Sequence, residues 1–430
     1  MLFSLDVLRA RKGDCLILHY GTKTDRRIIM IDGGPSKVYK PQLKERIKQI
    51  RKARKLAAEK ALPVEIVMVS HVDDDHIKGI LELTRELREM KEAQQPLPLR
   101  VGSLWHNSFD DLLTTTPKEL KVMAGFGLAA LDGNVPVPKG EDARQFEDTA
   151  GVLASIPQGR DLRLDGKFLG WKPNRQFKGK LILAAKDTKP APIDGGLNVT
   201  VVGPMQRELI ALQKKHDQWL RDQKKKKKKD AGAALAAFSD PSIHNLSSLV
   251  FHVEAAGKTM LLTGDARGDK ILDGLQLAKL LEKSAKSTTH VDVFKVPHHG
   301  SANNAKVELF KRITADHYVF SGNGEHGNPE RETLEMLFEA RGNAPFTMYF
   351  TYPIDEIDVE RKADWGKEQA EEKAQKKKTG KGTVRENWSP KKHSLAAFFA
   401  GEDLEAAGQA IEIVPDKSAF TIDLLDKLGF

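Results

Sequence analysis

The chain has 430 residues, of which 40% are hydrophobic and 30% are charged, and its formal net charge is +9. This composition excludes a chain that is disordered throughout, and the length accommodates one large domain or two ordinary ones. The single cysteine, Cys15, excludes an internal disulfide and favours a reducing compartment, so we expect a cytoplasmic protein. We expect no signal peptide and no membrane association, because no apolar stretch approaches the roughly 20 residues that cross a bilayer.

Two segments carry most of the positive charge. Lys224–Lys229 contributes six positive charges and residues 374–393 contribute a net six more, so the rest of the chain is close to neutral. Lysine tracts often stay solvated without any further role. They also attract polyanions through counterion release, which makes Lys224–Lys229 and Lys376–Lys392 candidate contacts for nucleic acid. Both interpretations stay open at this stage.

The first 110 residues alternate between short apolar strands and helices. The run Val64–Val69 is short and β-branched, as expected of a buried strand. The expected strands are Phe3–Leu8, Cys15–Tyr20, Arg27–Ile31, Val64–Val69 and Val101–His106. The expected helices are Pro41–Ala61 and Gly79–Ala93.

The rest of the main domain is expected to alternate in the same way after an interruption. Residues 110–190 are rich in glycine, proline and aspartate, so we expect an insertion or lid there, and a second insertion or mobile loop at 224–240. The expected strands are Leu197–Val202, Ser248–Glu254, Thr259–Thr263, Asp292–Val296 and His317–Ser321. The expected helices are Met205–Gln223, Asp269–Leu281, Val307–Ile313 and Arg331–Arg341. This alternation in two halves predicts an α/β protein, specifically an αββα sandwich, over residues 1–345.

Residues 346–430 are expected to form a C-terminal extension. Their pattern is a strand at Phe346–Thr351, a highly charged helix at Asp358–Lys378, a basic linker at 374–393 and two further strands, Ala410–Val414 and Ala419–Leu424. No motif in this part of the sequence indicates a function.

The segment Ser70–Gly79 concentrates potential metal ligands. Five of them occupy six consecutive positions: His71, Asp73, Asp74, Asp75 and His76. Because the segment directly follows an expected strand, it delivers imidazoles and carboxylates to one edge of a sheet. These are the ligand types that Zn²⁺, Mn²⁺ and Fe favour. The alternative is a polar N-cap for the next helix, but a cap requires one carboxylate, not three.

Two more expected strands end in ligand residues. One is followed by Gly264-Asp265 and the other by the pair His298-His299. A Gly-Asp pair alone is as typical of a turn as of a metal site. His106, at the end of Val101–His106, is either a hydrogen-bonded structural residue or a group that faces the metals. Three strands that run into ligand residues predict one composite site at a common sheet edge.

The order of these motifs resembles that of metallo-β-lactamase-fold hydrolases, specifically the soluble hydrolase domain of the competence protein ComEC. The resemblance covers about residues 1–345 and implies the same αββα sandwich. It rests on Leu5-Asp6-Val7 with Gly13-Asp14, Ile31–Gly34, His71–Gly79, Asn245–Val250, Leu261–Asp265 and Pro297–Ser301.

Three features depart from the pattern of the wider superfamily. Asp73 stands where the superfamily has a histidine. The third histidine of the first metal site falls at His244 or Asn245. The late Tyr-Gly-His-Pro motif reads Glu325–Pro329, which leaves its histidine in doubt unless His326 substitutes spatially.

The resemblance implies a centre with two divalent ions, Zn²⁺ or Mn²⁺, with Mg²⁺ also possible. His71, Asp73 and His244 are assigned to the first ion, Asp75, His76 and His298 to the second, and Asp265 to a bridge between them. His299 is assigned to the substrate phosphate or the leaving oxygen, although which of His298 and His299 is the ligand stays open. The expected catalytic residues are therefore Asp75, His298 and His299, and Asp74 is expected to cap the following helix.

The function favoured by these assignments is that of a metal-dependent phosphodiesterase or nuclease acting on DNA or RNA. A hydrolase of a small phosphodiester or another ester is the alternative among enzymes, because this fold serves many reactions. A third interpretation is a nucleic-acid-binding or partner-binding protein with a vestigial metal site.

Overall fold

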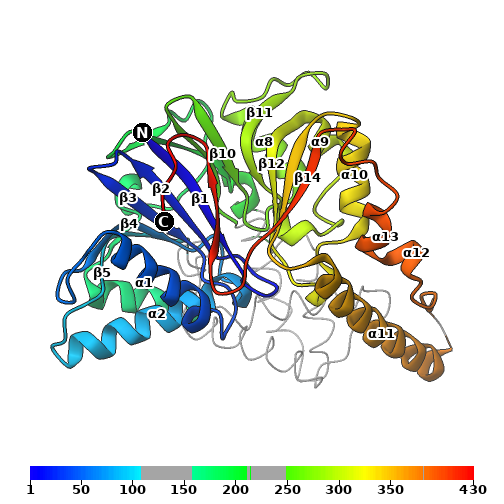
Figure 1. The fold of residues 1–430 in the computed structure, drawn as a ribbon, viewed down its shortest axis with the longest axis horizontal. Coiled ribbons are helices and arrows are strands. Elements are labelled where there is room, and N and C mark those ends of the chain that lie inside the picture. Colours follow the sequence, from blue (N-terminus) through cyan, green and yellow to red (C-terminus); the bar gives the residue numbers. More distant parts are fainter. Residues whose placement is uncertain (108–156, 211–213, 215–247, 381) are drawn as a thin grey trace.

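The computed structural model describes residues 1–107, 157–210, 214, 248–380 and 382–430. Within these ranges two sheets lie face to face, with helices on the outer side of each (Figure 1). This arrangement is the αββα sandwich that the alternation of strands and helices predicted. Some predictions lie outside the described residues: much of the insertion at 110–190, the helix Met205–Gln223 beyond its first turn, and Lys224–Lys229, His244 and Asn245.

In the described residues the first sheet has seven strands in the order β15-β1-β2-β3-β4-β5-β6. The neighbours from β15 to β3 are antiparallel, and those from β3 to β6 are parallel. The strands are β1 (Leu2–Leu8), β2 (Leu16–Gly21), β3 (Arg26–Ile31), β4 (Leu62–Met68), β5 (Leu99–Trp105), β6 (Lys172–Pro173) and β15 (Ala419–Asp423). Helices α1 (Lys44–Ala53) and α2 (Asp74–Glu92) accompany this sheet.

The second sheet has eight strands in the described residues, in the order β14-β13-β12-β11-β10-β9-β8-β7. Neighbours from β14 to β10 are parallel, and those from β10 to β7 are antiparallel. The strands are β7 (Ala191–Ile193), β8 (Leu197–Gly203), β9 (Val250–Ala255), β10 (Lys258–Leu262), β11 (Thr289–Lys295), β12 (Ile313–Phe320), β13 (Phe346–Phe350) and β14 (Gln409–Ile413). Helices α8 (Gly268–Leu277), α9 (Val307–Arg312) and α10 (Arg331–Arg341) accompany it.

Three apolar clusters account for the layers. Alternate side chains of β1, among them Phe3, Leu5 and Val7, are buried between the two sheets, as period-2 alternation requires. Across that interface the rings of Trp105 and Phe251 lie with centroids 5.2 Å apart. The other two clusters bury the outer faces of the sheets against α1 and α2 on one side and α8, α9 and α10 on the other.

The C-terminal residues belong to the same fold, which corrects the boundary expected at residue 345. β13 pairs in parallel with β12, β14 pairs with β13, and β15 pairs with β1 in the other sheet. This strand pairing could not be predicted from the sequence because the paired residues are far apart along the chain; for example, Ile422 lies opposite Leu5. The last residues therefore add an edge strand to each sheet.

Helix α11 (Ile354–Thr379) follows β13 and precedes β14 in the sequence, and it projects from the body of the molecule (Figure 1). Part of the expected basic linker is helical, because α11 runs to Thr379 and α12 (Pro390–His393) follows. The segment that follows α11 packs back against it, and the ring centroids of Trp365 and His393 lie 4.3 Å apart. None of the helices in the described part of the chain is both long and apolar enough to cross a membrane.

A buried ion pair joins the N-terminal strands to α1 and the C-terminal strand. The fully buried carboxylate of Asp6 accepts hydrogen bonds from Arg46 Nε at 2.8 Å and Nη2 at 3.0 Å, and from Thr421 Oγ1 at 2.6 Å. His19 Nε2 lies 2.7 Å from the same carboxylate. Burial raises the pKa of Asp6, but His19 and Arg46 outweigh it and lower the pKa to about 2.

Replacing Arg46 by methionine is expected to lower the free energy of unfolding by about 3–5 kcal/mol at pH 7, because the carboxylate of Asp6 loses its buried cation. Urea denaturation measures the change, and Lys48→Met, in an exposed pair with Glu45, is expected to stay within about 0.5 kcal/mol. Because the folded-state pKa of Asp6 is lowered, the stability from this contact is present above about pH 4 and lost as the pH falls towards 2. Equal effects of the two substitutions would contradict this account.

Candidate metal centre

The ligand residues meet at the carboxyl ends of parallel strands from both sheets. His71, Asp75 and His76 follow β4, Asp265 follows β10, and His298 and His299 follow β11. Carboxyl ends of parallel strands share one sheet edge, where α/β proteins place their sites. The three strand ends that carry candidate ligand residues therefore meet in one place.

The carboxylate of Asp265 lies at the middle of this cluster. Its Oδ1 lies 3.2 Å from His76 Nε2 and 3.6 Å from His299 Nε2. Its Oδ2 lies 3.7 Å from His71 Nε2 and 3.6 Å from His298 Nε2. Each oxygen of Asp265 therefore faces a different pair of imidazoles.

One set of ligand atoms gathers around Oδ1 of Asp265. Asp75, His76, Asp265 and His299 offer ligand atoms that all lie within 4.8 Å of one another. Four of these buried atoms lack a hydrogen-bond partner in the described structure: Asp75 Oδ1, His76 Nε2, Asp265 Oδ1 and His299 Nε2. An unsatisfied buried polar group costs roughly 1–3 kcal/mol. Four that converge on one point therefore fit a cation well.

A second set gathers on the other side of Asp265. His71, Asp73 and Asp75 form another group within 4.8 Å, and His298 reaches the same side of Asp265. Asp73 also accepts a hydrogen bond from the N–H of Asp74 through Oδ1 at 2.9 Å, as the N-cap of α2. Asp73, not Asp74 as expected, is therefore the cap, and its Oδ2 is the oxygen that lies near His71, at 4.0 Å from Nε2.

Each of the four imidazoles has Nδ1 next to a polar side chain and Nε2 near Asp265. The contacts are His71 with Ser70 Oγ at 3.3 Å, His76 with Asp32 Oδ2 at 2.8 Å, His298 with Asn304 Oδ1 at 2.8 Å, and His299 with Ser321 Oγ at 3.3 Å. A hydrogen bond at one ring nitrogen fixes the ring orientation and leaves the other nitrogen for a metal. The arrangement therefore orients all four imidazoles with Nε2 towards Asp265, as metal binding would require.

The ionisation of the site suits a cation. Burial and the neighbouring His76 lower the pKa of His71 to about 3, so His71 is a neutral imidazole. Burial raises the pKa of Asp265, but His299 and His76 outweigh it and hold the carboxyl ionised. Burial lowers the pKa of His76 and of His299, yet Asp265 and other carboxylates raise both well above the ordinary value. Protons on these two imidazoles balance charge that a metal ion would balance instead.

Three residues with no role assigned from the sequence belong to the centre. Asp32 contacts His76, Asp14 Oδ1 lies 3.4 Å from His299 Nδ1, and Lys295 Nζ lies 2.6 Å from Asp14 Oδ2. Asp14 and Asp32 lie in the Gly-Asp and Ile-Asp-Gly-Gly motifs. These motifs marked the resemblance to a known family but did not indicate what the two aspartates do. Lys295 was visible only as a charge near the end of the expected strand Asp292–Val296.

Two other histidines lie apart from the ligand groups of the described residues. His106 is buried, and its backbone N–H donates to Asn174 Oδ1 at 3.0 Å beside a cavity of about 320 Å³. His326 lies on a turn with its Nε2 2.7 Å from Lys12 Nζ. Neither contact places these histidines among the candidate ligands.

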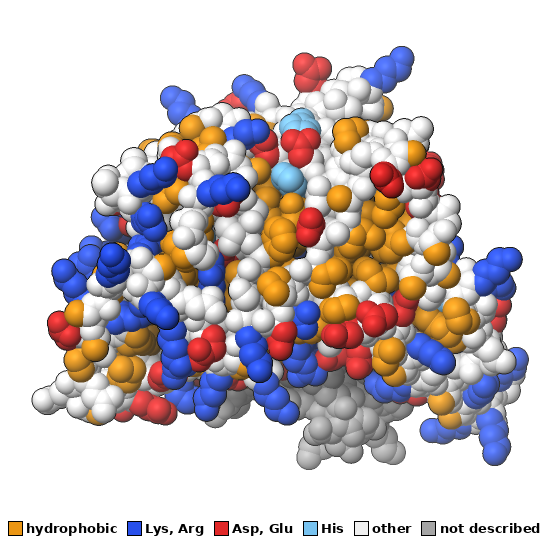
Figure 2. Space-filling model, in the orientation of Figure 1, with side chains coloured by type: hydrophobic (Ala, Val, Ile, Leu, Met, Phe, Trp, Pro, Cys, Tyr) orange, Lys and Arg blue, Asp and Glu red, His pale blue; other side chains and the backbone are white. Residues whose placement is uncertain are grey.

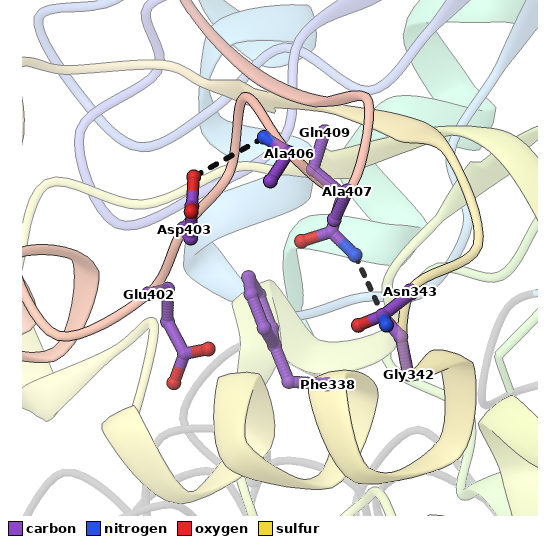
Figure 3. Close-up of a pocket in the computed structure, with 8 residues that line it drawn as sticks. All are labelled: Phe338, Gly342, Asn343, Glu402, Asp403, Ala406, Ala407 and Gln409. Carbon is purple, nitrogen blue, oxygen red and sulfur yellow. Dashed lines mark hydrogen bonds between the residues drawn. The ribbon is translucent and has the colours of Figure 1, made fainter.

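A second surface cavity, of about 410 Å³, lies away from the centre (Figure 3). It is lined by Phe338, Glu402, Asp403 and Gln409 among others, next to the amino ends of β13 and β14. Gln409 Nε2 donates to the carbonyl of Gly342 at 2.8 Å, so this side chain joins two turns. The candidate metal ligands lie at the opposite ends of the parallel strands.

Comparisons with known proteins give short or loose similarities. No family model matches the sequence. The chain is 28% identical to human microtubule-associated protein 1A over 109 residues, which are 24% of this chain and 4% of that protein. It is 42% identical to microtubule-associated protein futsch of Drosophila melanogaster over 52 residues, 12% of this chain and 1% of that protein. The chain thus spans only a small fraction of the length of these curated relatives.

Two solved structures align over most of the chain. Zn²⁺-bound PqqB from Methylobacterium extorquens aligns over 95% of this chain and 87% of that one, with 13% identity and a TM-score of 0.32. Unliganded yeast PDE1 aligns over 97% and 99%, with 10% identity and a TM-score of 0.28. Alignments this loose transfer no residue roles. What the strands and side chains define directly is an αββα sandwich with a candidate metal centre at the carboxyl ends of its parallel strands.

Proposed function

We propose that the protein is a metal-dependent hydrolase with two divalent ions in this centre, and that its substrates are phosphodiesters. The observation that carries the proposal is the convergence of four buried ligand atoms without a hydrogen-bond partner, one of them Asp265 Oδ1, with a second ligand set on the other side of Asp265. Two divalent ions held by these residues would supply a hydroxide at neutral pH and would stabilise the charge of an in-line displacement at phosphorus.

The geometry refines the assignment of ligands expected from the sequence. Asp75, His76 and His299 would hold one ion, and His71, Asp73 and His298 the other, with one oxygen of Asp265 for each. His299 thus takes the place expected for His298, and His298 the place expected for His244. We propose this set because each imidazole presents Nε2 to the nearer oxygen of Asp265.

The number of carboxylates supports two ions. Five carboxylates (Asp14, Asp32, Asp73, Asp75 and Asp265) and the ammonium of Lys295 form one connected cluster with the histidines. With neutral histidines the formal charge of this cluster is −4, which two divalent ions balance. Three of the carboxylates are in the ligand set, and an oxygen-rich site accepts Mn²⁺ or Mg²⁺ as well as Zn²⁺.

Substrate would approach on one side of the centre. The side chains of Asp73, His298 and Asp75 are 25%, 22% and 18% exposed, whereas those of His71 and His76 are nearly inaccessible. The three partly exposed ligands are therefore the ones closest to a bound phosphodiester. Water and substrate would reach the centre there, while the buried imidazoles of His71 and His76 would keep their orientation.

The basic end of α11 favours a nucleic acid strand over a small ester as substrate. Lys376, Lys377 and Lys378 end the helix and are exposed, as are Lys391 and Lys392 on the neighbouring α12. Blue side chains gather over this projecting end in Figure 2. Packing of Trp365 on His393 keeps the two segments together. A cluster of lysines on a fixed support attracts a polyanion through counterion release.

Replacing Lys376, Lys377, Lys378 and Lys391 by alanine tests the substrate class. We expect KM for long single-stranded DNA or RNA to rise about tenfold at moderate salt. The slope of log affinity against log salt is expected to shrink by about 0.7 for each phosphate group that the variant no longer binds. Hydrolysis of bis(p-nitrophenyl) phosphate should stay unchanged.

The matched control replaces four exposed lysines on or near α1: Lys40, Lys48, Lys52 and Lys60. It removes the same charge and should leave both substrates unaffected. Unchanged KM for strands in the α11 variant would favour a small phosphodiester or another ester as substrate. Strand binding by the wild type without any hydrolysis would favour a binding protein with a vestigial site.

A further inference from the structure

Lys295 is a lysine at the end of β11 whose side chain is only 1% exposed. Its Nζ lies 2.6 Å from Asp14 Oδ2 and donates to the carbonyl of Gly264 at 3.2 Å. Asp14 comes from the loop between β1 and β2, so the pair joins the two sheets behind the metal centre. Burying an ion pair costs more than burying apolar groups of similar volume, so fold stability alone is a weak reason for this pair.

The second oxygen of Asp14 faces a metal-ligating histidine. Oδ1 lies 3.4 Å from His299 Nδ1 and accepts a hydrogen bond from Ser321 Oγ, which also contacts that nitrogen. The backbone N–H of Asp14 donates to the carbonyl of Asp75 at 3.3 Å. Asp14 thus contacts two residues of the same ligand set, as Asp32 contacts His76.

Asp14 would otherwise be a ligand itself. Asp14, Asp32 and His76 form a further group whose ligand atoms lie within 4.8 Å of one another, and Asp14 Oδ2 lies 3.8 Å from His76 Nδ1. Lys295 contacts this same Oδ2. The lysine therefore occupies the oxygen that would complete a competing cation site behind the histidines.

We propose that Lys295 is a positioning residue of the metal centre: it binds one oxygen of Asp14, directs the other to His299 Nδ1, and so aims His299 Nε2 at the ion shared with Asp75. This inference rests on the proposed metal centre and adds a residue that no ligand motif contains. The lysine touches neither substrate nor ion. It acts through Asp14, which orients the imidazole of His299. The atom positioned in this way is His299 Nε2, which lies 3.3 Å from Asp75 Oδ2.

Cobalt binding tests the role of Lys295 without any assay of activity. Metal-free protein is titrated with Co²⁺ and followed by visible absorption and calorimetry. The wild type is expected to bind two ions. Lys295→Met and Asp14→Asn are each expected to weaken one of the two by about 10- to 100-fold and to change the absorption of that ion only. Lys258→Met is the matched control, because Lys258 pairs with Asp292 at 2.6 Å between β10 and β11, away from the ligands.

The double variant Asp14→Asn/Lys295→Met keeps the test decisive if a single variant fails to fold. The double variant removes both charges with little change in side-chain volume, and proteins tolerate the replacement of a buried ion pair by uncharged groups. We expect it to fold and to bind one of its two ions weakly. Two ions with wild-type affinity and absorption in the double variant would overturn the role of Lys295. A wild type that binds no Co²⁺ would overturn the metal centre itself, and this inference with it.

Discussion

Replacing Asp265 by asparagine is expected to lower kcat for phosphodiester hydrolysis at least about 1000-fold, which corresponds to about 4 kcal/mol in the barrier. The two oxygens of Asp265 face His76 and His299 on one side and His71 and His298 on the other. An amide of the same shape removes the negative charge and turns an NH₂ group towards one pair of imidazoles. The substitution therefore weakens both ions at once.

Elemental analysis and turnover of the same preparation check this expectation. Metal content should fall from two ions per chain to one or fewer, while circular dichroism stays that of the wild type. Asp269→Asn is the control, because Asp269 is an exposed carboxylate on α8 that pairs with Arg267 at 3.0 Å. Wild-type turnover in the Asp265 variant would remove the bridging role.

The part of the centre that could be predicted lies on short stretches of chain. His71 to His76 are consecutive, so one strand end places them together whatever the rest of the fold does. Asp265 and the pair His298-His299 follow from the rule that parallel strands share a carboxyl edge. The hydrophobic pattern of β4, β10 and β11 was enough to locate these ends within one or two residues.

The part that could not be predicted depends on contacts between distant residues and on local backbone geometry. His298 and His299 both adopt left-handed conformations, with φ of 48° and 55°. This turn sends neighbouring imidazoles to opposite sides of Asp265, and strand periodicity does not describe it. Asp14 and Ser321 meet across 307 positions to orient one histidine. Such pairs leave no spacing signal in a single sequence.

The same limit explains the error at the C-terminus. β14 and β15 are short and partly polar, and α11 separates them from the main domain with a long charged stretch. Only pairing with β13 and β1 identifies them as part of the sandwich. The charged helix suggested a domain boundary, but the chain returns after α11 to pair with β13 in the same sheet.

Removing the metal is expected to lower the melting temperature by about 6 °C at pH 7.5. Each ion at about 100 times its Kd adds about 2.7 kcal/mol to stability, and a chain of this length has an unfolding entropy of about 0.9 kcal/mol/K. The difference should widen as the pH rises. In the metal-free protein the pKa values of His76 and His299 are raised, so the stability from their protons is complete below about pH 6.5 and declines above it.

The metal-loaded protein should respond to pH in the opposite direction, because the ions replace those protons and bind more tightly as the histidines lose them. His71 is neutral in both forms over this range, since its pKa is lowered to about 3, and it cancels from the comparison. Calorimetric scans of metal-loaded and chelator-treated protein at pH 6, 7 and 8 measure the difference, and the Asp265→Asn variant should show much less of it. A difference independent of pH would mean that the imidazoles of His76 and His299 do not exchange protons for metal, and the ligand set would then have to exclude them.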